Sequence, residues 1–182
     1  IGAFERTGNR KDYAMTPPQP VLSNWLQDAG HPVIGIGKIS DIFSGQGLDH
    51  SLTGSDMVLM QHLKDQFAQA ADGSFVFANF VEFDSLYGHR RDVAGYARAL
   101  EWFDRALASL LAAMKPDDLL ILTADHGNDP TWPGTDHTRE RVPILCAGMG
   151  PKSLGLLGFE DVAATVATYL NVTPKGQGKS FL

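Results

Sequence analysis

The sequence has few of the features that mark secreted, membrane-spanning or nucleic-acid-binding proteins. Cys146 is its single cysteine, so the chain cannot form an internal disulfide framework. Its uninterrupted apolar runs are all shorter than the roughly 20 residues that a membrane-spanning helix requires. The 15 basic residues are outnumbered by 21 acidic ones, which leaves no overall positive charge to attract nucleic acid or anionic lipid. We therefore expect a cytoplasmic protein that binds neither nucleic acid nor membranes.

What remains is the composition of an ordinary folded domain. Hydrophobic residues make up 43% of the 182 residues and charged residues 20%, which is enough apolar side chain for a substantial core. Residues 1–20 show no helical or strand period, and they contain three prolines and the basic residues Arg6, Arg10 and Lys11. We interpret this segment as a loop or a connection.

Beyond residue 20, apolar patterns typical of helices alternate with short runs typical of buried strands. In chain order we predict a helix that ends near residue 30, a strand over 32–36, a loop over 38–54, a helix that follows Ser55, a strand over 75–81, a helix over 92–114, a strand over 119–123, a strand over 143–147 and a helix over 160–170. Strands separated by helices usually pair in parallel, so the pattern predicts a layered α/β fold.

Side chains that can bind metals follow the predicted strands. Asp84 and His89 follow one strand, Asp125 and His126 follow the next, and His137 lies in the segment after that. Ligands of open α/β sheets bind beyond the carboxyl ends of the strands, and mixed carboxylate and imidazole donors suit Zn, Mn or Fe better than Ca. Any one such pair is more often a capping carboxylate beside a solvated histidine. Three such segments together predict a metal centre, with enough donors for most of two sites.

The motifs around these residues resemble those of the phosphopentomutase family, a branch of the alkaline phosphatase superfamily. The resemblance extends from about residue 4 to the end of the chain. It is carried by residues 84–92 (DSLYGHRRD), 123–129 (TADHGND), 134–140 (GTDHTRE) and 36–43 (IGKISDIF). The second and third of these motifs together separate this family from its relatives.

The resemblance implies a three-layer, alkaline-phosphatase-like α/β core with a largely parallel sheet that is incomplete at its N-terminus. Residues 1–14 would be the end of a cap domain, and residues 15–182 the carboxy-terminal part of the metal-binding core domain. By the same resemblance, the sequence corresponds to the carboxy-terminal portion of a phosphopentomutase.

The resemblance also implies roles for individual residues. Asp84, His89 and His137 would hold one Mn²⁺, and Asp125 and His126 would contribute to a second Mn²⁺. Zn²⁺ and Fe²⁺ remain alternatives, because the same donors bind them.

Two basic residues match positions that contact the substrate's phosphate in the family, Arg6 and Lys38. A guanidinium can bind phosphate through two hydrogen bonds, and a lysine ammonium acts as a point charge. For the arginines beside the metal ligands, Arg90, Arg91 and Arg139, we expect ion pairs with neighbouring carboxylates rather than contact with substrate.

The activity implied is the interconversion of ribose (or 2-deoxyribose) 1-phosphate and 5-phosphate through a phosphorylated threonine. Neither that threonine nor one further metal-binding aspartate is identifiable in this sequence, so the catalytic nucleophile is unassigned and the 182-residue chain alone is expected to be inactive. Two alternatives remain open. One is a metal-dependent phosphatase or a phosphoglycerate-mutase-like enzyme of the same superfamily. The other is a non-catalytic module that associates with itself or with its own N-terminal portion.

Overall fold

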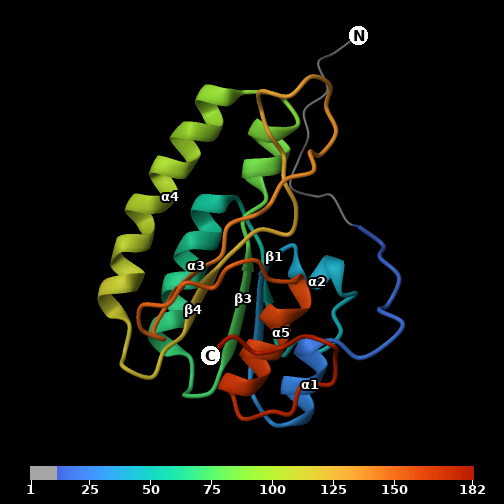
Figure 1. Cartoon of the computed structure of the whole chain (residues 1–182), viewed down its shortest axis with the longest axis vertical. Coiled ribbons are helices and arrows are strands. Elements are labelled where there is room, and N and C mark those ends of the chain that lie inside the picture. The colour runs from blue at the N-terminus through green and yellow to red at the C-terminus, as the bar shows by residue number, and fades with distance from the viewer. Residues whose placement is uncertain (1–11) are drawn as a thin grey trace. The chain divides into compact units, whose positions relative to one another are not determined.

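The computed structural model describes residues 12–182 and divides the chain into two compact units, Ile1–Phe80 and Val81–Leu182 (Figure 1). Arg6 and most of the segment assigned to the cap lie outside the described residues. The domain boundary at residue 14 therefore stays a prediction.

The first unit is built on a parallel sheet of three strands. β1 (Val33–Gly37) lies between β2 (His50–Leu52) and β3 (Phe75–Asn79). Ile34 pairs with His50 on one side and with Val76 on the other, and both pairings are parallel. Parallel strands require crossover connections rather than tight turns, and here those connections contain helices. The α/β fold expected from the sequence is confirmed in this unit.

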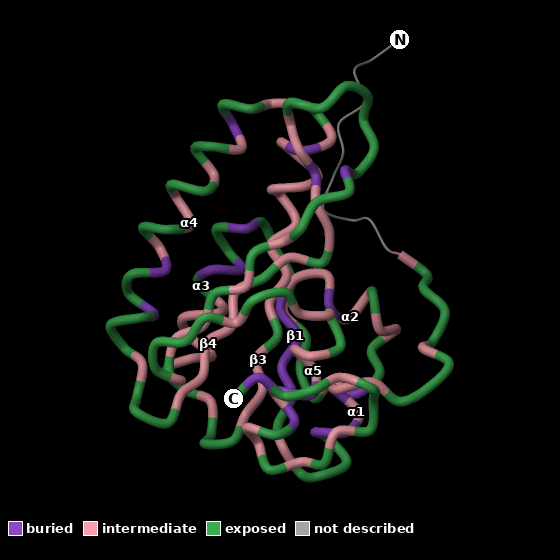
Figure 2. The backbone as a smooth tube through the Cα atoms, in the orientation of Figure 1, coloured by how far each residue is buried: buried purple, intermediate pink, exposed green. Residues whose placement is uncertain are grey.

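Helices pack on both faces of β1, which is the most buried strand (purple in Figure 2). α3 (Asp56–Gln69) places Leu59 against Ile34 and Ile36 on one face. The partly buried side chains around this core are Leu52, Leu63, Val76, Ala78 and Phe80. On the other face, a Cβ added at Gly35 would lie only 3.3 Å from the side chain of Ile39 in α2 (Ile39–Ile42). β1 is therefore covered from both sides.

Two short elements interrupt the segment that the sequence predicts as a loop. α2 comprises one helical turn and β2 three residues, and α1 (Leu22–Asp28) is the helix expected before β1. Glycine at 37 is required where β1 ends, because its φ is +80° and a Cβ would overlap the carbonyl oxygen of Asn79. Within this Gly-rich segment neither α2 nor β2 has a continuous apolar run that would have marked it in the sequence.

The second unit begins with a π-helical segment, η1 (Phe83–Gly88), followed by the long helix α4 (Val93–Ala113). The side chain of Asp92 caps α4 by accepting a hydrogen bond from the backbone N–H of Gly95 (2.8 Å). The ring of Phe83 contacts Tyr96 edge-on at a centroid distance of 5.8 Å. η1 is thereby attached to the first turn of α4 and cannot shift independently of it.

The last two strands pair differently from the first three. β4 (Leu120–Leu122) and β5 (Leu145–Ala147) are antiparallel, with Ile121 opposite Cys146. The prediction of parallel pairing applied to strands separated by helices, and no helix separates these two. The chain between them instead forms loops that carry three of the five predicted metal ligands, Asp125, His126 and His137. A final helix, α5 (Phe159–Tyr169), follows β5.

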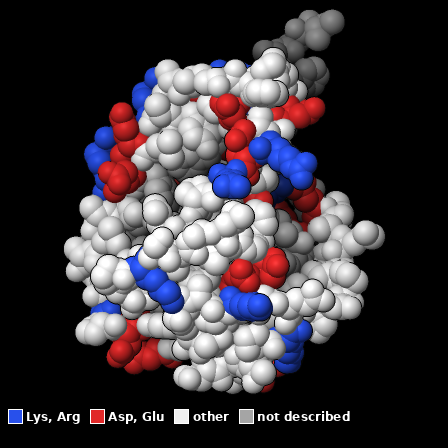
Figure 3. Space-filling model, in the orientation of Figure 1, with Lys and Arg blue, Asp and Glu red and all other residues white. Residues whose placement is uncertain are grey.

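The charge distribution agrees with the composition. On the face drawn in Figure 3, acidic and basic side chains are interspersed among uncharged ones. Within residues 12–182, no helix combines the length and the apolar character needed to cross a membrane.

Candidate metal centre

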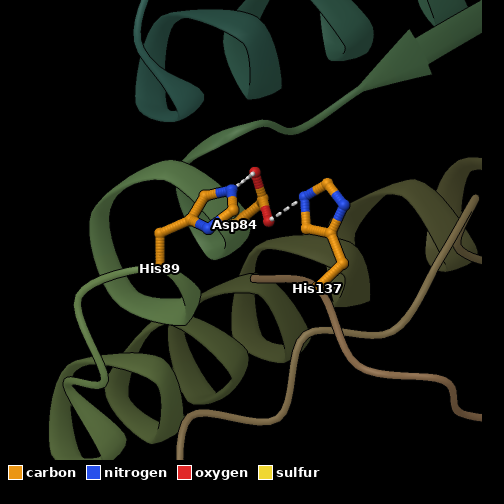
Figure 4. A group of neighbouring side chains, drawn as sticks. All are labelled: Asp84, His89 and His137. Atoms are coloured by element: carbon orange, nitrogen blue, oxygen red, sulfur yellow. Dashed lines mark ion pairs between the residues drawn. The ribbon is translucent and has the colours of Figure 1, made fainter. Parts of the chain in front are cut away.

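Three of the five predicted metal ligands converge in the second unit. Nε2 of His89 lies 3.2 Å from Oδ2 of Asp84, and Nε2 of His137 lies 3.3 Å from Oδ1 of the same carboxylate. Figure 4 shows the Asp84 carboxylate between the two imidazole rings. One potential ligand atom from each of the three residues lies within 4.8 Å of the others.

The π-helical segment explains why Asp84 and His89 meet. Residues five apart in an α-helix would point about 140° away from each other around the axis. Here the backbone N–H of His89 donates to the carbonyl of Asp84 (2.9 Å), which is the i to i+5 bond of a π-helix. That bond brings the two residues onto the same side of the turn. The sequence predicts only an irregular loop at this point.

A main-chain carbonyl orients the ring of His89. Nδ1 of His89 lies within hydrogen-bond distance of the carbonyl oxygen of Thr135. Because a carbonyl can only accept, Nδ1 is the donor in this contact, and Nε2 is the nitrogen left to bind a metal. Nε2 is the atom that faces Asp84. A carbonyl behind an imidazole is the usual support of a histidine that binds a metal.

Asp84 is oriented by a buried amide. Nδ2 of Asn128 donates a 2.6 Å hydrogen bond to Oδ1 of Asp84, and the Asn128 residue is only 8% exposed. Asn128 approaches η1 closely at Gly88, where an added Cβ would lie 2.6 Å from the amide nitrogen. The absence of a side chain at residue 88 therefore makes room for the amide that holds Asp84.

His137 is brought to the site by a short antiparallel bridge. The backbone N–H of Thr138 donates to the carbonyl of Gly127 (3.0 Å), so the segments around residues 127 and 138 run side by side. This pairing stacks the ring of His126 on the ring of His137, with 3.8 Å between the centroids. The hydroxyl of Thr138 accepts from the backbone N–H of Asp129 (2.7 Å) and holds the two segments together.

The remaining two predicted ligands are adjacent to this cluster but form no comparable group. Oδ2 of Asp125 lies 3.8 Å from Nε2 of His126, and the side chain of Asp125 is 68% exposed. Among the described residues, Asp84, His89 and His137 are the one group of three possible ligands that meets the distance criterion. The assignment of Asp125 and His126 to a second metal stays a prediction.

The arginines differ from expectation. Arg91 is directed mainly at carbonyl oxygens, among them those of Gly134 (2.6 Å) and Asp136 (2.7 Å), rather than at carboxylates. The pKa of Asp129 is lowered chiefly by hydrogen bonds from the N–H and hydroxyl of Thr131, and less by the positive charge of Arg91. Ion pairing is therefore not the main role of Arg91, and the prediction is wrong in this respect. Carbonyl oxygens of the loop that carries His137 surround the guanidinium of Arg91.

The electrostatics of the site also affect Tyr96. Burial raises the pKa of Tyr96, and the negative charge of Asp84 raises it further. Both effects favour the neutral phenol of Tyr96.

The structure does not test the two predicted phosphate contacts, Lys38 and Arg6. Lys38 follows β1, and its ammonium forms a 2.6 Å ion pair with Asp12. Arg6 lies outside the described residues. Both assignments stay predictions.

The donor set fits a transition-metal ion. One carboxylate and two imidazoles whose Nε2 atoms face it suit Mn²⁺, Zn²⁺ or Fe²⁺, whereas Ca²⁺ prefers oxygen donors alone. Asn128 and the Thr135 carbonyl supply the outer hydrogen bonds that such ligands require. Sequence reasoning assigned no role to either residue, although Asn128 lies inside the TADHGND motif.

Comparison with known proteins connects this site to a family. The profile of the Metalloenzyme superfamily matches residues 4–174. Phosphopentomutases of Shewanella denitrificans, Chelativorans sp. and Sinorhizobium medicae are 52%, 53% and 50% identical to the chain over 183, 184 and 185 residues. These alignments cover 98%, 98% and 100% of the chain, but only 45%, 45% and 46% of the relatives. With its Asp84, His89 and His137 cluster and a profile match over most of its length, the chain belongs to the Metalloenzyme superfamily.

Proposed function

We propose that this chain forms the metal-binding part of a phosphopentomutase, an isomerase that interconverts ribose (or 2-deoxyribose) 1-phosphate and 5-phosphate. One observation carries the proposal: a carboxylate and two imidazoles converge in a chain that is half identical to phosphopentomutases over nearly its whole length. A cytoplasmic setting goes with the proposal, in agreement with the single cysteine.

Asp84, His89 and His137 would hold one Mn²⁺, and Asp125 with His126 would contribute to a second. Bound cations of this kind supply positive charge that stabilises a phosphoryl group during its transfer. The part played by the protein is to fix the ligands. The Thr135 carbonyl holds Nδ1 of His89, which leaves Nε2 directed at Asp84, and the amide of Asn128 holds Asp84 in turn.

The substrate's phosphate would be bound by Lys38 and Arg6. In the structure Lys38 is paired with Asp12, so phosphate binding would require the ammonium to exchange one anionic partner for another. The phosphoryl carrier would be a threonine from the portion of the relatives that this sequence does not match. That portion exceeds half of their length, since the matched part is 45% to 46%.

A chimera tests the proposal directly. The segment of the Shewanella denitrificans phosphopentomutase that aligns with this chain is replaced by the chain, which preserves 52% of the aligned residues. The product is assayed with Mn²⁺ on ribose 5-phosphate, on phosphoglycerate and on an aryl phosphate. The unaltered relative and a chimera carrying Asp84→Asn serve as controls.

The proposal predicts conversion of ribose 5-phosphate to ribose 1-phosphate, and loss of that conversion in the Asp84→Asn chimera. A folded chimera that acts only on phosphoglycerate or the aryl phosphate would instead support the alternative reactions of the superfamily. Circular dichroism shows whether each chimera is folded before its activity is interpreted.

A further inference from the structure

The geometry points to Arg91 as a positioning residue that fixes all three ligands of the Asp84, His89 and His137 cluster at once. The inference rests on the proposed function only in taking this cluster as the metal site. Arg91 itself would touch neither metal nor substrate. It would act through the groups that hold the ligands.

Five oxygen atoms from two parts of the chain accept hydrogen bonds from the Arg91 guanidinium. They are the carbonyl oxygen of Gly88 (3.0 Å), Oδ1 of Asn128 (2.6 Å) and the carbonyl oxygens of Asp129 (2.9 Å), Gly134 (2.6 Å) and Asp136 (2.7 Å). The planar guanidinium suits this arrangement, because its N–H groups diverge in one plane and carry no competing acceptor.

The first connection leads to Asp84. By accepting from Arg91, Oδ1 of Asn128 is fixed, which leaves Nδ2 directed at Oδ1 of Asp84. An amide without a partner on its oxygen could flip and would then present an acceptor to the carboxylate. Arg91 therefore determines which end of Asn128 faces Asp84.

The second connection leads to both histidines. The carbonyls of Gly134 and Asp136 lie on either side of Thr135, whose own carbonyl accepts from Nδ1 of His89. By binding both flanking carbonyls, Arg91 fixes the orientation of the Thr135 carbonyl. Asp136 also directly precedes His137, so the same contact anchors the start of that ligand.

The backbone of Arg91 supports this interpretation. Its φ is +55°, in the left-handed region that residues other than glycine rarely adopt. Such a conformation usually costs on the order of 1 kcal/mol or more and persists where surrounding contacts enforce it. At residue 91 those contacts are the hydrogen bonds of its own side chain.

The test compares Arg91→Lys and Arg91→Ala with the wild-type 182-residue chain. Arg90→Ala is the matched control, since Arg90 is the neighbouring arginine and is exposed. Mn²⁺ affinity is measured by titration calorimetry. Loss of an outer hydrogen-bonding partner of a metal ligand typically weakens affinity about 10- to 100-fold, and we expect that loss in both Arg91 variants and not in Arg90→Ala.

A second readout needs no metal. Nitrogen-15 NMR of the imidazole rings reports whether Nδ1 of His89 carries a hydrogen that is held in a hydrogen bond. A hydrogen-bonded Nδ1–H signal of His89 should be present in the wild-type chain and in Arg90→Ala. In Arg91→Lys that signal should weaken, because the Thr135 carbonyl is no longer held.

The outcomes separate this inference from the proposed function. Wild-type affinity and an unchanged Nδ1–H signal of His89 in Arg91→Lys would overturn the positioning role, while Mn²⁺ binding by the wild-type chain would leave the metal site intact. Unfolding of both Arg91 variants would also overturn it in favour of a purely structural role. A wild-type chain that binds no Mn²⁺, with a His89 Nδ1–H signal that depends on Arg91, would contradict the metal site and support the role of Arg91.

Discussion

At the scale of single residues, Asp84 is the centre of the candidate site. Each of its carboxylate oxygens lies within 3.3 Å of a histidine Nε2, and Oδ1 also accepts from Asn128. Its negative charge provides the main attraction for a cation between the two imidazoles. Asp84→Asn removes this charge with little change in the shape of the side chain, so it tests the site.

We predict that Asp84→Asn weakens Mn²⁺ binding by at least about 100-fold, more than the 10- to 100-fold loss typical of outer-sphere changes. The exposed Asp104→Asn in α4 is the control for removal of one negative charge. Equilibrium dialysis with metal analysis gives both affinities. Equal affinity for the two variants would show that Asp84 is not a ligand.

The sequence reveals which residue types are gathered but not how each is oriented. Carboxylate and imidazole side chains that recur after strands predicted Asp84, His89 and His137 as ligands together with Asp125 and His126, and the family resemblance grouped the first three on one metal. The orientation of the His89 ring depends on a carbonyl 46 residues away in sequence, at Thr135. Main-chain carbonyls have no signature in a sequence, so this support could not have been predicted.

At the scale of elements, the long helices and the apolar strands were predicted well, whereas α2, β2 and η1 were not. α4 was expected over residues 92–114 and extends over Val93–Ala113, since its apolar residues repeat over several turns. A strand was expected over 143–147, where β5 lies, but its antiparallel pairing with β4 was not anticipated. The i to i+5 hydrogen bonds of η1 leave no periodic pattern in six residues.

The start of α4 gives a prediction at this scale. Asp92→Ala removes the acceptor for the N–H of Gly95 and should lower the free energy of unfolding by about 1 kcal/mol. Asp104→Ala, in the exposed middle of the same helix, should change it by less than about 0.5 kcal/mol. Urea unfolding followed by circular dichroism measures both values. Similar losses in the two variants would contradict the capping role.

The C-terminal tail gives a pH-dependent prediction. Asp161 accepts hydrogen bonds from the N–H groups of Lys179 and Gly158, both at 2.8 Å, and these lower its pKa below the ordinary 3.8. A carboxylate with a lowered pKa stabilises the folded state fully above its unfolded pKa, and that stabilisation is lost as the pH falls through the folded pKa.

Asp161→Asn should therefore be less stable than the wild-type chain at pH 7, and the difference should shrink as the pH falls below about 4. Urea unfolding at a series of pH values from 7 to 3 measures it. If the difference in free energy of unfolding does not change with pH, the charge of Asp161 does not stabilise the C-terminal tail.

At the scale of the whole molecule, the chain spans less than half the length of the phosphopentomutases that it matches, 45% for Shewanella denitrificans. The family resemblance could be predicted from four motifs, because their residue types and spacing are specific. How the substrate is held could not be predicted in the same way. Lys38 belongs to one compact unit, and the metal ligands belong to the other.

We predict that the 182-residue chain alone has no mutase turnover even with Mn²⁺ present. The phosphate-carrying threonine and one further metal-binding aspartate implied by the family are not identifiable within it. Coupled detection of ribose 1-phosphate formed from ribose 5-phosphate is the assay, and the phosphopentomutase of Shewanella denitrificans is the positive control. Turnover by the purified chain would refute the prediction.

The central claim is that Asp84, His89 and His137 form a metal site, and one crystallographic measurement tests it most directly. Crystals of the chain soaked in Mn²⁺ are measured at a wavelength at which manganese scatters anomalously. The account predicts an anomalous peak bonded to the Asp84 carboxylate and to Nε2 of both histidines. A well-occupied peak elsewhere, with none at this cluster, would contradict it.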